Sequence, residues 1–261
     1  MHNMQRLLEI MQRLRDPEHG CPWDLAQTMS SIVPHTIEEA YEVAEAIEQN
    51  DIQAIQDELG DLLFQVVFYA QLGQELGVFD FDAIAGSIAE KLIRRHPHVF
   101  AGHEYASETE QHLHWEQLKA EERARKTVPT AEASVLDGIT TTLPAMSHAC
   151  KLQKRAAQVG FDWPAWRGVL DKVREELVEL EACWEKDAKH RTEELGDLLF
   201  SCVNLARHAG DDPETVLRQA NRKFERRFRR MEQDLAKEGE AIREASLERL
   251  EQSWQRIKSF D

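Results

Sequence analysis

The chain contains the sequence Glu-Leu-Gly-Asp-Leu-Leu-Phe twice, as residues 58–64 and again as residues 194–200. On a helix with about 3.6 residues per turn, the Glu and the Asp lie three residues apart on one face, and the Leu and Phe side chains cover much of the remainder. Each copy therefore presents two carboxylates at the edge of an apolar surface. This repeat predicts two related helices, each able to contribute to a metal site.

A second acidic pair precedes each copy. Glu58, which opens the first copy, lies 19 residues after Glu39, and Glu194, which opens the second, lies 18 residues after Glu176. Similar turns should therefore join the two helices of each pair. Antiparallel packing of such helices can make four carboxylates converge. The two predicted ligand sets are Glu39, Glu42, Glu58 and Asp61 in the first repeat, and Glu176, Glu179, Glu194 and Asp197 in the second.

Four carboxylates in one place favour a bound cation. Their mutual repulsion would raise their pKa values unless a positive charge neutralised them. Hard oxygen ligands without a required His or Cys favour Mg²⁺ over zinc, with Mn²⁺ as a second choice. Magnesium commonly bridges to a substrate phosphate, so the pattern indicates polyphosphate chemistry. A solvated acidic helix face is the alternative, but repetition of the whole spacing favours the metal site.

The distribution of Gly and Pro predicts an all-α fold. These residues are few and fall between long stretches with helical periodicity, while alternating β-type runs are missing. In the first half we expect four helices. The first covers residues 3–15, and the second begins between Pro34 and Glu38 and ends near residue 49. The third covers 52–76, and the fourth runs from a cap at Asp80 or Asp82 to Arg95. The third, apolar nearly all round, should be central and buried. Together they should close a four-helix unit.

The same order of helices recurs in the second half. Helices are expected over residues 143–159 and 166–186, then one carrying the second acidic motif, then one capped at Asp211-Asp212-Pro213. An additional helix should cover about 240–260. The predicted organisation is an N-terminal repeat over 1–105, a polar linker over 106–135 with an exposed helix near 108–125, and a C-terminal repeat over 136–261.

Composition narrows the functional classes. The hydrophobic fraction of 42% is ample for a folded core, and the net charge of −16 argues against a nucleic-acid partner, which requires clustered Lys and Arg. The N-terminus lacks an apolar signal core and no run is long enough for a membrane span, so a cytoplasmic protein is expected. The four cysteines are widely spaced and should be reduced and mostly structural.

Several basic and aromatic residues are candidates for nucleotide contacts. Lys172 and Arg191 each lie one turn before an acidic ligand, and Lys223 and Arg227 share a helix face that could hold phosphates. Ordinary ion pairs, or compensation of a helix dipole, would explain these positions too. Trp254 is a candidate for contact with a nucleobase. Four further residues, His96, His98, His112 and His114, suggest a ligand cluster, but their places beside Pro97 and in the polar linker favour surface or capping roles.

The chain resembles the MazG family. The resemblance rests on Cys21-Pro22-Trp23-Asp24, Glu38-Glu39-Ala40-Tyr41-Glu42, both copies of the repeated motif, Arg94-Arg95-His96-Pro97-His98-Val99-Phe100, Lys151-Leu152-Gln153-Lys154 and Val159-Gly160-Phe161-Asp162-Trp163. It implies two tandem repeats of the four-helix-bundle type that dimerise through helices, and a Mg²⁺-dependent enzyme that converts an NTP or dNTP into the monophosphate and pyrophosphate.

The resemblance also ranks the two repeats. It implies that the C-terminal repeat is catalytic, with metal ligands Glu176, Glu179, Glu194 and Asp197 and nucleotide contacts Lys172, Arg191, Lys223, Arg227 and Trp254. The N-terminal repeat keeps all four acids and Lys91. Its fourth helix, however, ends at His96-Pro97 where the other copy continues through Phe228, and no additional helix follows it. We therefore expect a structural or regulatory role for the N-terminal repeat and a minor metal site there.

Three alternatives remain at this stage. A narrow-specificity all-α enzyme acting on dUTP or phosphoribosyl-ATP would share the acidic helices. A di-iron carboxylate bundle is disfavoured because neither cluster contains the Glu-x-x-His that such sites usually take from a helix. A non-enzymatic acidic scaffold would show no Mg²⁺-dependent stabilisation by nucleotide.

Overall fold

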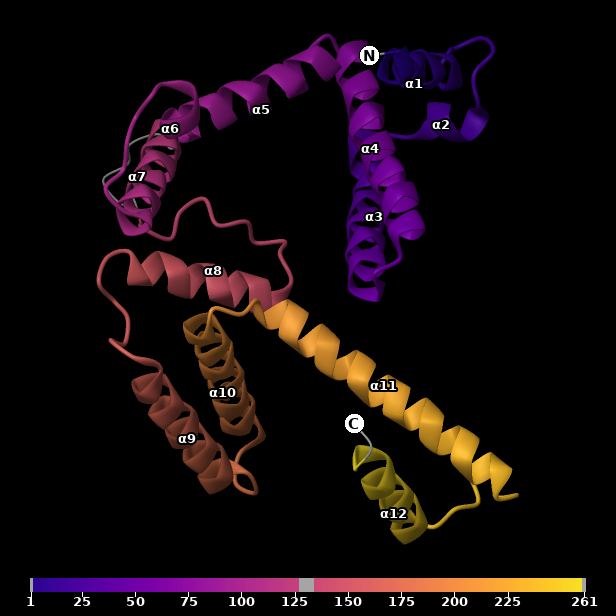
Figure 1. The fold of residues 1–261 in the computed structure, drawn as a ribbon, viewed down its shortest axis with the longest axis vertical. Coiled ribbons are helices and arrows are strands. Elements are labelled where there is room, and N and C mark those ends of the chain that lie inside the picture. Colours follow the sequence, from indigo (N-terminus) through magenta and orange to yellow (C-terminus); the bar gives the residue numbers. More distant parts are fainter. Residues whose placement is uncertain (1, 127–133, 260–261) are drawn as a thin grey trace. The chain divides into compact units, whose positions relative to one another are not determined.

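The computed structural model describes residues 2–126 and 134–259, and every regular element within them is a helix (Figure 1). Helix contacts divide the chain into two units, Met1–Glu121 and Glu122–Asp261. The all-α fold with an internal repeat is therefore confirmed. Within the described residues, no helix combines the length and apolar character needed to cross a membrane.

The first unit is built on a pair of long helices that lie side by side, α3 and α4 (Figure 1). Helix α1 packs on α4, and α5 contacts α4 and α6. The bounds are α1 His2–Leu14, α2 Pro22–Ala26, α3 Met29–Gln49, α4 Ile52–Glu75, α5 Phe81–Arg95 and α6 Pro97–Phe100, while α7, Glu108–Lys126, crosses the division between the units.

The second unit repeats this order. Helices α9 and α10 form the side-by-side pair, α8 packs on α10, and α11 contacts α8, α10 and α12 (Figure 1). The bounds are α8 Ala145–Ala157, α9 Trp166–Cys183, α10 Ala188–Ala209, α11 Pro213–Lys237 and α12 Leu247–Lys258. The expected cap of α11 is present, since the Asp212 side chain accepts a hydrogen bond from the Thr215 amide and Pro213 is the first helical residue.

The expected start of α3 between Pro34 and Glu38 is wrong, because the helix begins at Met29 with Pro34 inside it. Thr28 and Ser31 form a capping box in which each side chain accepts the backbone N–H of the other. Two otherwise unpaired N–H groups are satisfied in this way. The box therefore sets the start of the helix, and Pro34 costs one hydrogen bond further along.

The C-terminal helix also starts later than expected. Residues near Glu240 form turns, and α12 begins at Leu247, where the Ser246 hydroxyl accepts a hydrogen bond from the Arg249 amide. The expected end at Phe260 lies outside the described residues. In the linker the helix expected near 108–125 is present as α7.

Helix α4 is buried only in its second half. Its side chains at Val67, Phe68 and Leu72 join Met11 and Ile32 in the core of the first unit. In the first half, by contrast, Leu59 is 49% exposed. The expectation that this helix is buried throughout is therefore wrong for the segment that carries the acidic motif.

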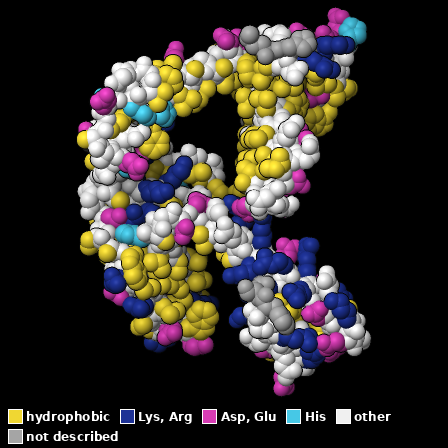
Figure 2. Space-filling view, viewed as in Figure 1, with side chains coloured by type: hydrophobic (Ala, Val, Ile, Leu, Met, Phe, Trp, Pro, Cys, Tyr) yellow, Lys and Arg dark blue, Asp and Glu magenta, His cyan; other side chains and the backbone are white. Residues whose placement is uncertain are grey.

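Apolar side chains remain exposed on both helix pairs, so neither repeat encloses a complete bundle core by itself. Helix α5 has no buried residue. On the second pair the exposed side chains include Leu177, Val178, Leu199 and Phe200. Figure 2 shows hydrophobic side chains gathered over α9 and α10 and over α3 and α4. These faces are available to a further partner.

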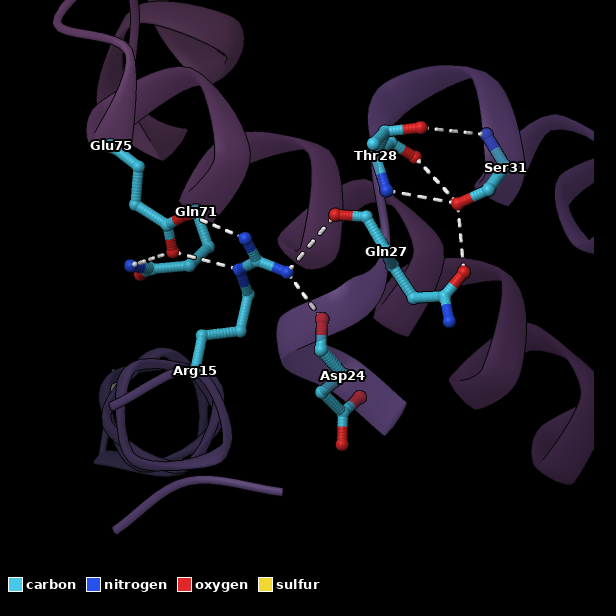
Figure 3. Close-up of polar contacts among 7 residues, drawn as sticks. All are labelled: Arg15, Asp24, Gln27, Thr28, Ser31, Gln71 and Glu75. Carbon is cyan, nitrogen blue, oxygen red and sulfur yellow. Dashed lines mark hydrogen bonds and ion pairs between the residues drawn. The ribbon is translucent and has the colours of Figure 1, made fainter. Parts of the chain in front are cut away.

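One buried arginine fastens the N-terminal loop to the end of α4 (Figure 3). Arg15 donates from Nε and Nη2 to the two carboxylate oxygens of Glu75, at 2.7 and 2.6 Å. Its Nη1 donates to the carbonyl oxygen of Asp24, within α2, and to that of Gln27, which lies between α2 and α3. The paired carboxylate oxygens match the fork of the guanidinium, so the contact fixes geometry as well as charge.

The second repeat makes the same connection with the charges exchanged. Here the loop supplies the acid, Asp162, and the end of α10 supplies Arg207 and His208, whose side chains contact one carboxylate oxygen. The hydrogen bonds from these partners outweigh burial and lower the pKa of Asp162. Each repeat thus ties its tryptophan-containing loop to the helix that carries the acidic motif.

Candidate metal and nucleotide site

The acidic residues are positioned by short turns within each helix pair. Asp187 caps α10 by accepting a hydrogen bond from the Lys189 amide, and Asp51 caps α4 in the same way through Gln53 and Ala54. In the turn between α3 and α4, Asn50 takes up the left-handed conformation that the turn requires, with φ of 56°. The acids on neighbouring helices are thereby held face to face.

The structure brings three carboxylates together in each repeat. One oxygen from each of Glu176, Glu194 and Asp197 lies within 4.8 Å of the others. The N-terminal group, Glu39, Glu58 and Asp61, meets the same limit. Only one of the six, Glu176, is buried. Each group comes from two packed helices, as the spacing predicted, but it contains three of the four carboxylates expected to converge. Each group could hold a metal ion.

The fourth acid of each set lies close enough to act electrostatically. Burial and then the charge of Glu179 raise the pKa of Glu194. In the N-terminal group, burial comes first and the charge of Glu42 adds to it in raising the pKa of Glu58. A bound cation would remove this repulsion. Glu179 and Glu194 also line a cavity of about 440 Å³ together with Lys186 and His190.

Of the expected basic contacts, Lys172 reaches the C-terminal cluster. Its Nζ lies 2.7 Å from Glu176 and 2.6 Å from Glu175, and these hydrogen bonds raise its pKa. Arg191 is directed to the α9–α10 turn, where it donates to the Trp184 carbonyl at 3.0 Å and lies over the Trp184 ring.

His190 is a contact that sequence reasoning missed. Its Nε2 lies 3.3 Å from Glu194 Oε1, across one helical turn. The signal was present in the sequence as the spacing of four residues between the two side chains.

Lys223, Arg227 and Trp254 belong to the α11–α12 pair. Trp254 packs against Phe224 with ring centroids 5.2 Å apart, and Phe224 stacks on Phe228 at 5.8 Å. Below these rings, Met231, Leu235 and Ile257 form a small core that holds the two helices together. This pair thus presents basic and aromatic side chains next to one another.

The two repeats differ in the positions next to their acids. Where the C-terminal repeat has Lys172, His190 and Arg191, the N-terminal repeat has His35, Ala54 and Ile55 at the same spacing. Glu39 is contacted by the neutral amide of Gln65 at 3.4 Å instead of by a lysine. The N-terminal cluster therefore keeps its carboxylates but has no lysine or arginine at these three positions, a difference that comparison of the two spacings would have revealed.

The described residues contain two helix pairs with converging carboxylates and no regular element other than helix. They define an all-α protein with a repeated acidic motif. Comparison with known proteins identifies the family, because the MazG nucleotide pyrophosphohydrolase domain matches residues 27–100 and 168–231. The chain belongs to the MazG family of enzymes, as its motifs predicted.

Relatives match over nearly the whole chain. The nucleoside triphosphate pyrophosphohydrolase of Escherichia coli (strain K12) is 52% identical over 99% of this chain and 98% of its own length. The nucleoside triphosphate pyrophosphohydrolase/pyrophosphatase MazG of Thermotoga maritima is 44% identical over 98% of this chain and 96% of its own. The uncharacterized protein YabN of Bacillus subtilis is 40% identical over the full chain, which matches 52% of that protein.

Proposed function

We propose that the chain hydrolyses nucleoside triphosphates, both NTP and dNTP, between the α- and β-phosphates to give the monophosphate and pyrophosphate. The observation that carries this proposal is the cluster of Glu176, Glu194 and Asp197 with a lysine beside it. The names of the full-length relatives support the substrate class.

The residues fit Mg²⁺, with Mn²⁺ as an alternative. The cluster offers carboxylate oxygens, which are the ligands that hard divalent cations prefer. Glu176, Glu179, Glu194 and Asp197 would hold the ion. When bound, the ion would supply charge neutralisation for the phosphates and lower the pKa of water.

The protein's own groups then position the substrate. Lys172, Arg191, Lys223 and Arg227 would contact the phosphates, and Trp254 would contact the base. A carboxylate of the cluster would accept the proton of the water that attacks the α-phosphorus. The β-phosphate oxygen leaves as pyrophosphate. Positioning and charge neutralisation would supply most of the acceleration, so no covalent intermediate is required.

We further propose that the C-terminal repeat, 136–261, is catalytic and that the N-terminal repeat, 1–105, has a structural or regulatory role with a minor metal site. The absence of lysine and arginine at the three positions next to Glu39 and Glu58 supports this ranking. The exposed apolar side chains on α9 and α10 support assembly as a homodimer through helices. The cytoplasmic location and the absence of a nucleic-acid partner stay predictions.

The decisive experiment is product analysis with a panel of NTPs, dNTPs and phosphoribosyl-ATP in the presence of Mg²⁺. Monophosphate and pyrophosphate from several bases are expected. Turnover of dUTP or phosphoribosyl-ATP alone would replace the broad activity with a narrow one. Release of orthophosphate, or no turnover by a folded protein that also shows no Mg²⁺-dependent thermal shift with nucleotide, would overturn the proposal.

A further inference from the structure

The N-terminal unit contains a second polar cavity that the proposed reaction does not use. It has a volume of about 210 Å³ and lies where α5 ends, next to α6 and the first turns of α7 (Figure 1). Its walls include one guanidinium, imidazoles, an amide and an indole, supplied by Arg95, His96, His98, Gln111, His112 and Trp115. These are mainly hydrogen-bond donors.

Two buried nitrogen atoms in these walls have no hydrogen-bond partner: His98 Nδ1 and Trp115 Nε1. The indole nitrogen can only donate. The Gln111 amide nitrogen lies 3.2 Å from His98 Nε2, so it donates there and His98 Nε2 accepts. In a neutral imidazole the proton then sits on Nδ1, which makes this atom a second unsatisfied donor.

Unsatisfied buried donors indicate what the cavity would accept. An N–H buried without an acceptor is destabilising, and a ligand oxygen would recover that loss. Arg95 adds a positive charge to the same wall. A carboxylate, Glu108, lies on the exposed rim and would repel an anion there, so the favourable contacts are on the side of His98 and Trp115.

A metal ion fits these walls less well. In the part of the chain that the structure describes, the only groups with three ligand atoms within 4.8 Å are the two carboxylate clusters. His96 and His98 have ring centroids 5.7 Å apart, and His96 Nδ1 lies 2.7 Å from the Leu92 carbonyl, to which it donates. A proton on His98 Nδ1 would also prevent that atom from coordinating.

We propose that this cavity binds a small phosphate-type oxyanion, either orthophosphate or pyrophosphate. The volume is below the range of about 300–1,000 Å³ typical of sites for drug-sized ligands, so the cavity fits a small anion better than a whole nucleoside triphosphate. The oxyanion accepts hydrogen bonds from His98 Nδ1 and Trp115 Nε1 and is paired with Arg95. The C-terminal repeat lacks this cavity's motif, because Arg227 is followed by Phe228 inside a continuous α11.

The test is calorimetric titration of the full chain with orthophosphate and, separately, with pyrophosphate. Both titrations contain EDTA, so that the carboxylate clusters carry no metal and repel the anions. The variants are Trp115→Phe, which removes one N–H and keeps the ring size, and Arg95→Gln. Trp166→Phe, a half-exposed tryptophan in the other unit, is the matched control.

Binding by the parent chain and by Trp166→Phe is expected, with at least roughly tenfold weaker binding by Trp115→Phe and Arg95→Gln. The tighter of the two anions identifies the ligand. Equal affinity in all four proteins, or no binding of either anion, would overturn the proposal.

A second readout does not depend on the folding of the variants. The indole N–H resonance of Trp115 in an amide correlation spectrum of the parent chain should shift as phosphate is added. The indole resonance of Trp166 should not move. If only resonances outside the N-terminal unit shift, the anion binds elsewhere and the proposal fails. Neither readout requires turnover, so its failure is distinguishable from failure of the proposed hydrolysis.

Discussion

Lys172 Nζ lies 2.7 Å from Glu176 Oε1, and Glu176 is the buried member of the C-terminal carboxylate cluster. A buried carboxylate is stable only if it is paired or coordinates a cation. The lysine therefore stabilises the cluster in the absence of metal, and the same ammonium group would be available to a substrate phosphate once a metal ion is bound.

Replacement of Lys172 by Met should make the metal-free protein less stable by about 1–3 kcal/mol, because Glu176 loses its charged partner. Added Mg²⁺ should restore part of the loss. Thermal unfolding with and without Mg²⁺ measures both effects. Lys189→Met is the control, since Lys189 is 86% exposed and its pair with Glu193 spans 3.8 Å. A similar loss in the control would show that Lys172 has no special role.

Equivalent substitutions in the two repeats should have unequal effects on activity. Asp197→Asn removes one charge from the C-terminal cluster and should lower kcat/KM by a factor on the order of 100 or more. Asp61→Asn makes the same change in the N-terminal cluster and should lower kcat/KM less than about twofold, because that cluster is expected to act on catalysis only through a minor electrostatic effect. Steady-state pyrophosphate release measures both. The reverse order of effects would make the N-terminal repeat the catalytic one.

The sequence predicted where the helices begin and end better than it predicted which of their side chains are buried. Helix α4 was predicted within one residue of its observed end because Asp51 and Gly77 bound a long apolar period. The start of α3 was misplaced because the pairing of Thr28 with Ser31 competes with the preference of Pro34 for a first turn. Whether Leu59 is buried depends on packing between helices, which periodicity within one helix does not determine.

The candidate site shows the same limit. The spacing predicted that four carboxylates converge, and the structure groups three of them, Glu176, Glu194 and Asp197, because turn length and helical repeat fix their positions. The direction of Arg191 was not predictable, since its long side chain can reach either the carboxylates or the Trp184 carbonyl. The buried donors at His98 and Trp115 could not be foreseen because they arise from a fold of three helices and a loop.

Glu75→Gln should destabilise the N-terminal unit in a pH-dependent way. Hydrogen bonding to Arg15 lowers the pKa of Glu75 below its usual 4.5. Because the folded-state pKa is the lower one, the ion pair stabilises the protein above pH 4.5 and its contribution is lost as the pH falls through the folded-state pKa. At pH 7 the variant should lose about 2 kcal/mol, as expected when a buried guanidinium loses one charged partner.

Urea unfolding at pH 7 and in the acid range measures this difference. The gap between parent and variant should narrow in acid. Glu9→Gln is the control, because Glu9 is exposed and accepts only a 3.4 Å hydrogen bond from Gln5. A gap for Glu75→Gln that stays constant with pH would mean that packing, not the charge pair, provides the stability.

Trp254→Ala should raise KM far more than it lowers kcat. The indole ring packs on Phe224 at the surface of the α11–α12 pair, where a base could stack on it. Loss of one base–aromatic stack corresponds to about 1–3 kcal/mol, or roughly 5- to 150-fold in KM. Kinetics with ATP and with inorganic tripolyphosphate separate the effects. If the variant loses activity equally on both substrates, Trp254 stabilises the packing of α11 on α12 and does not contact the base.

Identical phenylalanines in the two repeats should respond differently to a charge, because their surroundings differ. Phe64 packs against the first unit's core and meets Phe68 edge-on at 5.9 Å. Phe200, its counterpart, is 44% exposed among the apolar side chains of α10. If that face forms the proposed dimer, Phe200→Glu buries an unpaired charge only on association, and should weaken the dimer roughly 100-fold or more while sparing the fold. Phe64→Glu should instead lower the thermal unfolding temperature.

Sedimentation velocity over a concentration series, paired with thermal unfolding, measures both responses. A Phe200→Glu protein that remains dimeric at the same concentrations would place the dimer interface elsewhere.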